Sequence, residues 1–218
     1  MNRLLRDRDG SSMLESTLVL PVVLLVALGT IDFTYMLYEW ALASKAAEVG
    51  ARIAVVTDPV AVGITNLTYD PTLISEPCFD ATGAANGNCP TADTVCTPTA
   101  GGGACTNGYT FDNTAFISDG GVLAGMKTIF PRLGRTNVQI AYHTTGLGFV
   151  GRPSGLPMSV TVSIRCMAHN FYFIGGLMAF FTGSAWTYTA PDGCPAGPTG
   201  PQIPAFATTL TSEDMTTN

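Results

Sequence analysis

Six cysteines are the residues of this 218-residue chain with the clearest chemical potential. None of the gaps between them gives the C-x-x-C spacing of a structural zinc site, which disfavours metal binding. An even number of cysteines in a loop-rich region that follows an apolar segment is typical of disulfides, with free thiols as the other alternative. Proximity in sequence favours the pairs 78–89, 96–105 and 166–194. The cysteines are Cys78, Cys89, Cys96, Cys105, Cys166 and Cys194.

The remaining side chains give little support for catalysis. His143 and His169 are isolated from each other, and no H-x-x-x-H or H-E-x-x-H spacing occurs. The serine of residues 151–155, GRPSG, is displaced from its place in a G-x-S-x-G elbow. The glycine-rich segments lack the lysine that follows in a phosphate-binding loop. We therefore expect a protein that is not an enzyme and that binds no metal or cofactor.

The composition indicates a membrane segment. Hydrophobic residues make up 46% of the chain and charged residues only 12%, about half of the roughly 25% that is usual for a soluble domain. The formal net charge of −6 disfavours a nucleic-acid partner, since such proteins carry a basic face.

The apolar run lies at residues 13–37. As a helix it is about 37 Å long, sufficient to cross a hydrocarbon core of about 30 Å. Three arginines precede it, which favours a cytoplasmic N-terminus, and Tyr35, Tyr38 and Trp40 lie where an aromatic belt is expected. The sequence therefore predicts one transmembrane helix, with the rest of the chain from about residue 40 outside the membrane.

Three interpretations of this segment compete. It is a plain membrane anchor, a cleavable secretory signal with an A-x-A site at residues 41–43, or a segment with a more specific role. The run is longer than the usual apolar region of a signal, and cutting after Ala43 would fall inside a continuous helix. Glu15 favours the third interpretation, because an acidic residue near the membrane is costly. The alternative for Glu15 is a first-turn acid favoured by the helix dipole.

A short basic leader, Gly10, an acidic residue five positions later and an apolar helix together resemble a type IV prepilin. The resemblance implies that a prepilin peptidase cuts between Gly10 and Ser11. It also implies that Glu15 pairs with the terminal amine of a neighbouring subunit during assembly, as a buried charge needs a partner. Ser11 stands where many such pilins begin with Phe.

Residues 18–56 narrow the resemblance to TadE/TadG-like proteins of the tight-adherence pilus system. The features that carry it, together with Glu15, are Pro21, Gly29, Asp32-Phe33, Ala46-Ala47 and Gly50-Ala51-Arg52. The resemblance implies a minor pilin or pseudopilin in the inner membrane, with a periplasmic domain that becomes extracellular in the assembled pilus. Its implied partners are other pilin or pseudopilin subunits, the prepilin peptidase, the inner-membrane assembly platform and the lipid bilayer. The alternative is a bitopic protein whose exported domain binds a ligand or partner without entering a filament.

Small residues recur at helical spacing in the second half of the predicted helix. They share one face, which allows another helix to come close, although alanine is also simply a good helix former. Glycine at position 50 costs about 1 kcal/mol relative to alanine, which favours a packing role. Glu48 and Arg52 are spaced to pair along the helix, whereas Asp32 is expected either at the membrane exit or against a basic partner. The small residues are Ala43, Ala47, Gly50 and Ala54.

The fold class expected is α+β, with a long N-terminal transmembrane helix and a small antiparallel β-sheet domain with disulfide-stapled loops. Residues 1–10 form the leader, residues 11–56 the long helix, and residues 57–194 the exterior domain, which includes a Cys-rich loop at 76–108. Residues 195–218, rich in proline and then in polar residues, are expected to be a flexible tail.

Within the exterior domain, residues 114–130 predict a short helix, weakened by Gly120 and Gly121, whose inward residues are Phe116, Leu123, Met126 and Phe130. Alternation with period two predicts strands at 136–144 and 158–166, and a third strand is expected at 183–189. The apolar segment 170–183 is too short and too glycine-rich for a second crossing. It is either a buried turn or an exposed patch for a pilus neighbour or the membrane surface.

Overall fold

The structure is a computed structural model that describes residues 8–64, 82, 84, 93–145, 147, 157–169, 171–176, 183, 194 and 205–212. The chain divides into two compact units. Unit 1 comprises Met1–Glu39 and Ala168–Gln202, and unit 2 comprises Trp40–Met167 and Ile203–Asn218. The expected fold class is confirmed, since a long apolar helix precedes antiparallel sheets and disulfides.

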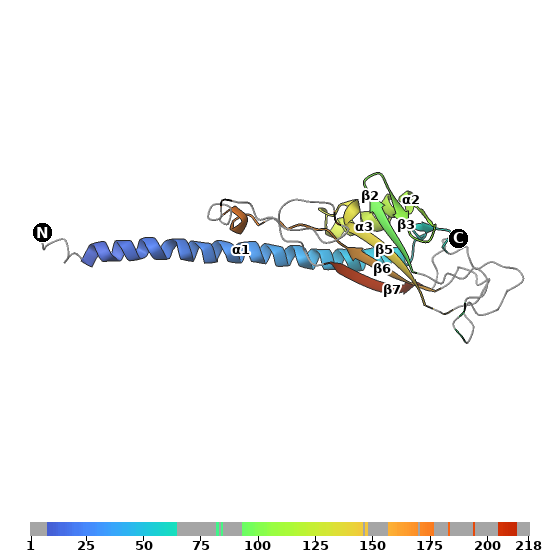
Figure 1. Cartoon of the computed structure of the whole chain (residues 1–218), viewed down its shortest axis with the longest axis horizontal. Helices are drawn as coiled ribbons and strands as arrows, with labels where there is room; N and C mark the ends of the chain where they lie inside the picture. The colour runs from blue at the N-terminus through green and yellow to red at the C-terminus, as the bar shows by residue number, and fades with distance from the viewer. Residues whose placement is uncertain are drawn as a thin grey trace, which may run out of the picture. The chain divides into compact units, whose positions relative to one another are not determined.

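Helix α1 (Arg8–Ala54) contributes to both units. It begins three residues before the expected start at residue 11, and Pro21 lies inside it. Figure 1 shows α1 as one continuous helix. Its last turn holds Arg52, whose positive charge favours the C-terminal end of the helix dipole. The predicted pair forms, because Arg52 Nη2 lies 2.7 Å from Glu48 Oε1 on the solvent-exposed side of the helix. The hydrogen bond and charge of Lys45, followed by those of Arg52, hold the pKa of Glu48 below its usual value.

Unit 2 contains a five-stranded antiparallel sheet of order β3-β2-β5-β6-β7 and a two-stranded sheet of β1 and β4. A continuous seven-residue register pairs β5 with β6, and a second pairs β6 with β7. The elements after α1 are β1 (Ala61–Val62), β2 (Thr94–Thr99), β3 (Gly102–Cys105), β4 (Thr110–Phe111), α2 (Asn113–Ile117), α3 (Val122–Ile129), the 3-10 turn η2 (Arg135–Asn137), β5 (Val138–Thr144), β6 (Met158–Ile164) and β7 (Phe206–Ser212).

The second half of α1 packs against the buried face of this sheet. Gly50 lies against α3 and β6, where a methyl group in its place would come within 2.6 Å of Met126 Sδ and 3.2 Å of Val162 Cγ1. Trp40 packs edge-on against Phe206 of β7, with ring centroids 5.3 Å apart. Ser212 Oγ donates a hydrogen bond to the carbonyl of Val55 at 3.1 Å. The end of α1 is therefore part of the core of unit 2.

The alternation of apolar and polar residues correctly predicts strands β5 and β6 of the sheet. Val160, Val162 and Ile164 of β6 are buried on one face, as expected from the sequence. The residues expected to face inward between 114 and 130 are also buried: Phe116, Leu123, Met126 and Phe130. The region forms two short helices rather than one, and Phe130 is the C-cap of the second, because Gly120 adopts a φ of +96° and Gly121 caps α3.

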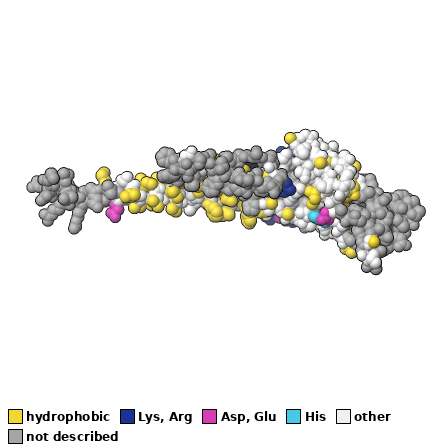
Figure 2. Space-filling view, in the orientation of Figure 1, with side chains coloured by type: hydrophobic (Ala, Val, Ile, Leu, Met, Phe, Trp, Pro, Cys, Tyr) yellow, Lys and Arg dark blue, Asp and Glu magenta, His cyan; other side chains and the backbone are white. Residues whose placement is uncertain are grey.

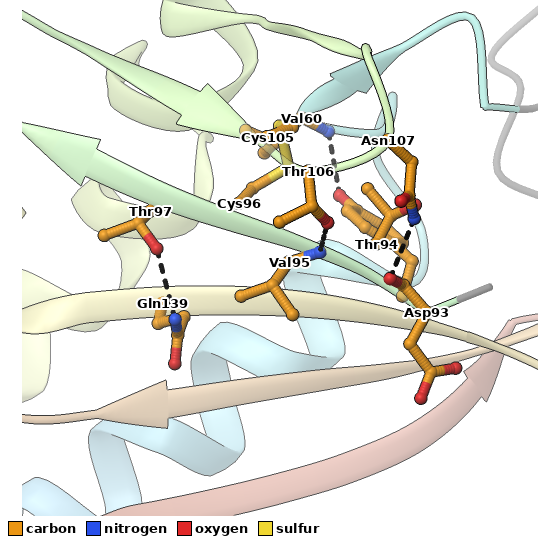
Figure 3. The surroundings of a disulfide bond; sticks show 11 residues. Val60, Asp93, Thr94, Val95, Cys96, Thr97, Cys105, Thr106, Asn107 and Gln139 are labelled. Atoms are coloured by element: carbon orange, nitrogen blue, oxygen red, sulfur yellow. Dashed lines mark hydrogen bonds between the residues drawn. A yellow bond between two sulfur atoms is a disulfide. The ribbon is translucent and has the colours of Figure 1, made fainter.

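A buried tyrosine fixes the chain where it leaves α1. The backbone N–H of Val60 donates to the hydroxyl of Tyr142 on β5 at 2.8 Å (Figure 3). Tyr142 is fully buried, and this burial raises the pKa of its phenol well above the usual value of 10.0. The hydrogen bond satisfies an amide that would otherwise be buried without an acceptor.

The predicted Cys-rich loop at 76–108 is wrong for residues 94–105. Strands β2 and β3 form a hairpin there, and the disulfide between Cys96 and Cys105 joins residues directly opposite each other (Figure 3). The hairpin is further held by the bond from Val95 N–H to Thr106 Oγ1 at 2.9 Å. The pairing of Cys166 with Cys194 is also as expected. Cys78 and Cys89 lie outside the described residues.

The expectation of a flexible tail at 195–218 is wrong for β7. Residues 206–212 form an edge strand of the sheet that pairs along its whole length with β6. The physical reason is that Phe206, Leu210 and Ser212 find contacts on the core side, while the alternate residues Ala207, Thr209 and Thr211 face solvent. The strand expected at 183–189 lies outside the described residues, apart from Gly183.

Candidate functional site on the apolar helix

The first part of α1 presents apolar side chains to its surroundings. The helix Glu15–Ala54 contains a stretch of mean hydropathy 2.1 of which only 6% is buried, so it is a candidate membrane span. Figure 2 shows these side chains along the helix. A helix that is apolar and exposed in this way needs a membrane or other helices around it. The exposed residues include Leu18, Val19, Leu20, Val22, Val23, Leu24, Leu25, Val26, Ile31, Phe33 and Leu37.

The residues expected to be processed and to guide assembly lie at the start of this helix. Gly10 and Ser11 fall within the first turn of α1, where the structure describes the backbone and not the side chains. Glu15 is exposed and lies four residues after Ser11, so the two share one face about 6 Å apart along the axis. A new amine at Ser11 and the carboxyl group of Glu15 would therefore be presented on the same side of the helix.

Asp32 is the one acidic residue of α1 between Glu15 and Glu39, and it is buried. Its two carboxyl oxygens accept hydrogen bonds from three consecutive backbone amides, those of Tyr172 at 3.2 Å, Phe173 at 2.8 Å and Ile174 at 2.8 Å. An acidic side chain at the centre of a membrane helix costs about 2.5–3.5 kcal/mol on insertion scales. The three donors offset this cost and fix residues 172–174 against α1.

A second buried polar contact lies two helical turns further along. His169 Nδ1 is 2.6 Å from Glu39 Oε2, and both side chains are almost completely buried. Tyr35, between Asp32 and Glu39 in sequence, packs against the ring of His169 with centroids 5.8 Å apart, and Phe171 packs edge-on against the same ring at 5.0 Å. His169 Nε2 is buried and has no hydrogen-bond partner among the described residues.

Asp32, Tyr35 and Glu39 are spaced i, i+3 and i+7 and so occupy one face of α1. We call this face, with His169 and Tyr172–Ile174 that contact it, the polar seam. Sequence reasoning named Asp32 and His169 separately and missed Glu39. The signal available was the recurrence of polar residues at helical spacing inside an apolar run. Asp32 meets backbone amides within its own chain, rather than the basic partner considered from the sequence.

The other candidate residues are not part of the polar seam. Ala43, Ala47, Gly50 and Ala54 all lie in the core of unit 2, so this face of small residues packs within the chain. His143 is half-exposed in unit 2, with Nδ1 2.9 Å from Asp93 Oδ2. Among the described residues, no three His, Cys, Asp or Glu side chains are grouped closely enough to hold a metal ion.

These features define a class of protein, one with an N-terminal candidate membrane helix that continues into the core of a small α+β unit. Residues 10–52 match the family model of TadE-like proteins, which confirms that this part of the chain resembles that family. The match covers most of α1 and leaves the rest of the chain uncovered. No curated protein and no solved structure matches the chain.

Proposed function

We propose that the chain is a minor pilin or pseudopilin that is inserted in the inner membrane and takes part in assembling a tight-adherence type IV pilus. The observation that carries the proposal is the coincidence of the TadE-like match at residues 10–52 with an exposed apolar helix. The match begins at Gly10, the residue before the proposed cut. Its role is structural rather than enzymatic.

The apolar side chains of α1 can be covered first by lipid and later by other pilin subunits. Before assembly, the exposed side chains between Leu18 and Leu37 require hydrocarbon around them. After assembly, the same side chains can pack against the helices of neighbouring subunits. Glu15, exposed at the start of this stretch, is placed to meet the new amine of a neighbour that begins at Ser11. In this proposal the other partners are the prepilin peptidase and the inner-membrane assembly platform.

The proposed orientation places the basic N-terminus in the cytoplasm and unit 2 in the periplasm. Disulfides support it, because Cys96–Cys105 and Cys166–Cys194 are stable bonds in an oxidising compartment. Protease added to spheroplasts is expected to digest unit 2 and to spare the N-terminal leader of an uncleaved Gly10→Val chain. Protection of unit 2 would contradict this orientation.

Processing is the decisive test. Intact mass measurement of the protein from cells that contain the peptidase is expected to find Ser11 as the first residue, and Gly10→Val is expected to block the cut. Ser12→Ala is the matched control, because it changes the same helical turn and keeps Gly10. A mature chain that still begins at Met1 would refute the pilin assignment and favour a bitopic protein that stays out of the filament.

Assembly is tested separately. Glu15→Ala is expected to permit cleavage and to reduce filaments on the cell surface, because the terminal amine of a neighbour then lacks its acidic partner. Glu48→Ala on the same helix is the control, since Glu48 pairs with exposed Lys45 and Arg52 and is expected to leave assembly unchanged. Normal filaments with Glu15→Ala would rule out the proposed role of Glu15.

A further inference from the structure

We propose that residues 171–176 are inserted in the same hydrocarbon layer as α1, as a short second membrane segment held in place by Asp32. The inference goes beyond the pilin assignment and rests on one part of it, the spanning of the bilayer by α1. It concerns contacts within unit 1, to which both α1 up to Glu39 and residues 171–176 belong.

The first argument is position. Ile174 Cδ1 would lie 3.6 Å from a methyl group on Gly29, so it contacts the helix inside the predicted span of 13–37. An apolar groove of about 630 Å³ lies between α1 residues from Pro21 to Gly29 and the segment from Tyr172 to Gly176. Helix residues 21–32 cover about 16 Å along the axis. The segment therefore lies beside the apolar stretch and not beyond its end.

The second argument is backbone satisfaction. Residues 174–176 are helical, and the backbone amides just before and at the start of a helix have no acceptor within it. Such amides are tolerated in hydrocarbon only where they find partners within the protein. The amides of Tyr172, Phe173 and Ile174 find theirs on Asp32. In water these amides would need no such acceptor, and an acidic residue would not need to be buried in an apolar helix to provide it. In lipid, the hydrogen bonds between Asp32 and these amides give the amides an acceptor and give the buried carboxylate its donors.

The third argument is exposure. Tyr172 is 67% exposed and Phe173 is 44% exposed, although both lie next to the most apolar part of the chain. The ring of Tyr172 packs edge-on against Tyr35 at 5.7 Å, so the aromatic residues gather near the outer end of the predicted span. Tyr172 and Phe173 are therefore exposed to the same environment as the apolar side chains of α1. We therefore infer that acyl chains, rather than a second protein, cover Phe173.

Fluorescence quenching by lipids tests this directly. In the full-length chain with Trp40 and Trp186 replaced by Phe, a single tryptophan is introduced and the protein is reconstituted in phosphatidylcholine vesicles brominated along the acyl chains. Phe173→Trp is the test position. Val23→Trp on α1 reports insertion of the helix, and Ile117→Trp on α2 reports an exposed site of unit 2. Aqueous iodide is the second quencher.

The proposal predicts that bromolipid quenches Phe173→Trp to about the same extent as Val23→Trp, and several-fold more than Ile117→Trp. Quenching of Phe173→Trp by iodide, or by neither quencher, would overturn it and place the residue in water or against protein. If bromolipid quenches Val23→Trp but not Phe173→Trp, only the inference about residues 171–176 is overturned. Loss of quenching at Val23→Trp overturns the membrane assignment of α1 as well.

Asp32 is tested as the positioning residue in the same vesicles. Asp32→Ala is expected to lower bromolipid quenching of Phe173→Trp to the level of Ile117→Trp while leaving Val23→Trp unchanged. Asp32→Asn keeps one acceptor oxygen and is expected to give an intermediate value. Equal quenching of Phe173→Trp in all three backgrounds would show that Asp32 does not hold the segment in the membrane.

Discussion

Gly50 offers a quantitative test of how α1 packs in unit 2. Alanine at this position gains about 1 kcal/mol of helix propensity over glycine. Its methyl group, however, would lie 2.6 Å from Met126 Sδ and 3.2 Å from Val162 Cγ1. Overpacking of this kind costs about 1–3 kcal/mol. Gly50→Ala is therefore expected to be neutral or to lower the free energy of unfolding by up to about 2 kcal/mol.

Met126→Ala separates the two effects. Alone it is expected to cost about 2–5 kcal/mol, because Met126 is fully buried and leaves a cavity. In that background the methyl group of Gly50→Ala enters the vacated space, so the substitution is expected to stabilise by about 1 kcal/mol. The coupling between the two sites is then about 1–3 kcal/mol and favourable.

The assay is urea unfolding of the full-length chain in a mild detergent with disulfides intact, followed by near-ultraviolet circular dichroism. Gly29→Ala is the matched control on α1, since its methyl group would meet Ile174 only at an ordinary 3.6 Å. It is expected to leave the unfolding of unit 2 unchanged. The packing argument would be refuted if Gly50→Ala stabilised unit 2 equally in both backgrounds, because the two sites would then be uncoupled.

Three further outcomes are expected. Tyr142→Phe should cost about 1–3 kcal/mol at neutral pH, since a buried amide loses its acceptor. Because the folded pKa of Tyr142 is raised above 10.0, the unfolded chain releases the phenolic proton first, so stability is complete below pH 10 and then falls by up to about 1.4 kcal/mol per pH unit. Urea unfolding between about pH 8 and 11 should show a smaller alkaline loss in Tyr142→Phe, and an equal loss would contradict the argument. Glu39→Leu or His169→Phe alone should cost about 3–5 kcal/mol and the double variant much less, whereas additive losses in thermal unfolding would contradict a mutual pair. Replacing Cys96 and Cys105 by Ser should cost about 2 kcal/mol, and an unchanged unfolding midpoint in urea would show that the hairpin alone orders this region.

The parts of the fold that the sequence predicts are those where one pattern dominates. A long apolar run predicts α1, and strict alternation predicts β5 and β6. Strand β2 is not predicted in this way because Pro98 interrupts its pattern and Gly101–Gly103 follow it. The structure accommodates Pro98 because β2 pairs with β5 only at Thr94–Cys96.

The polar seam shows a different limit. The partners of Asp32 are backbone amides about 140 residues away in sequence, which carry no side-chain signature. Similarly, nothing near Glu39 indicates that His169 lies beside it. Such contacts depend on the path of the chain after β6, and local sequence patterns do not encode that path.

The position of β7 has a consequence for the order in which unit 2 folds. Its residues are the last of the sheet to be synthesised, yet they pair with β6, whose Met158 lies opposite Ser212. Until they arrive, β6 has an unpaired edge that can join another chain, because open strand edges promote association. The central strands can form early, but the sheet is completed only after Phe206–Ser212 has been made. A chain truncated before Phe206 is therefore expected to aggregate rather than merely to lose a terminal extension.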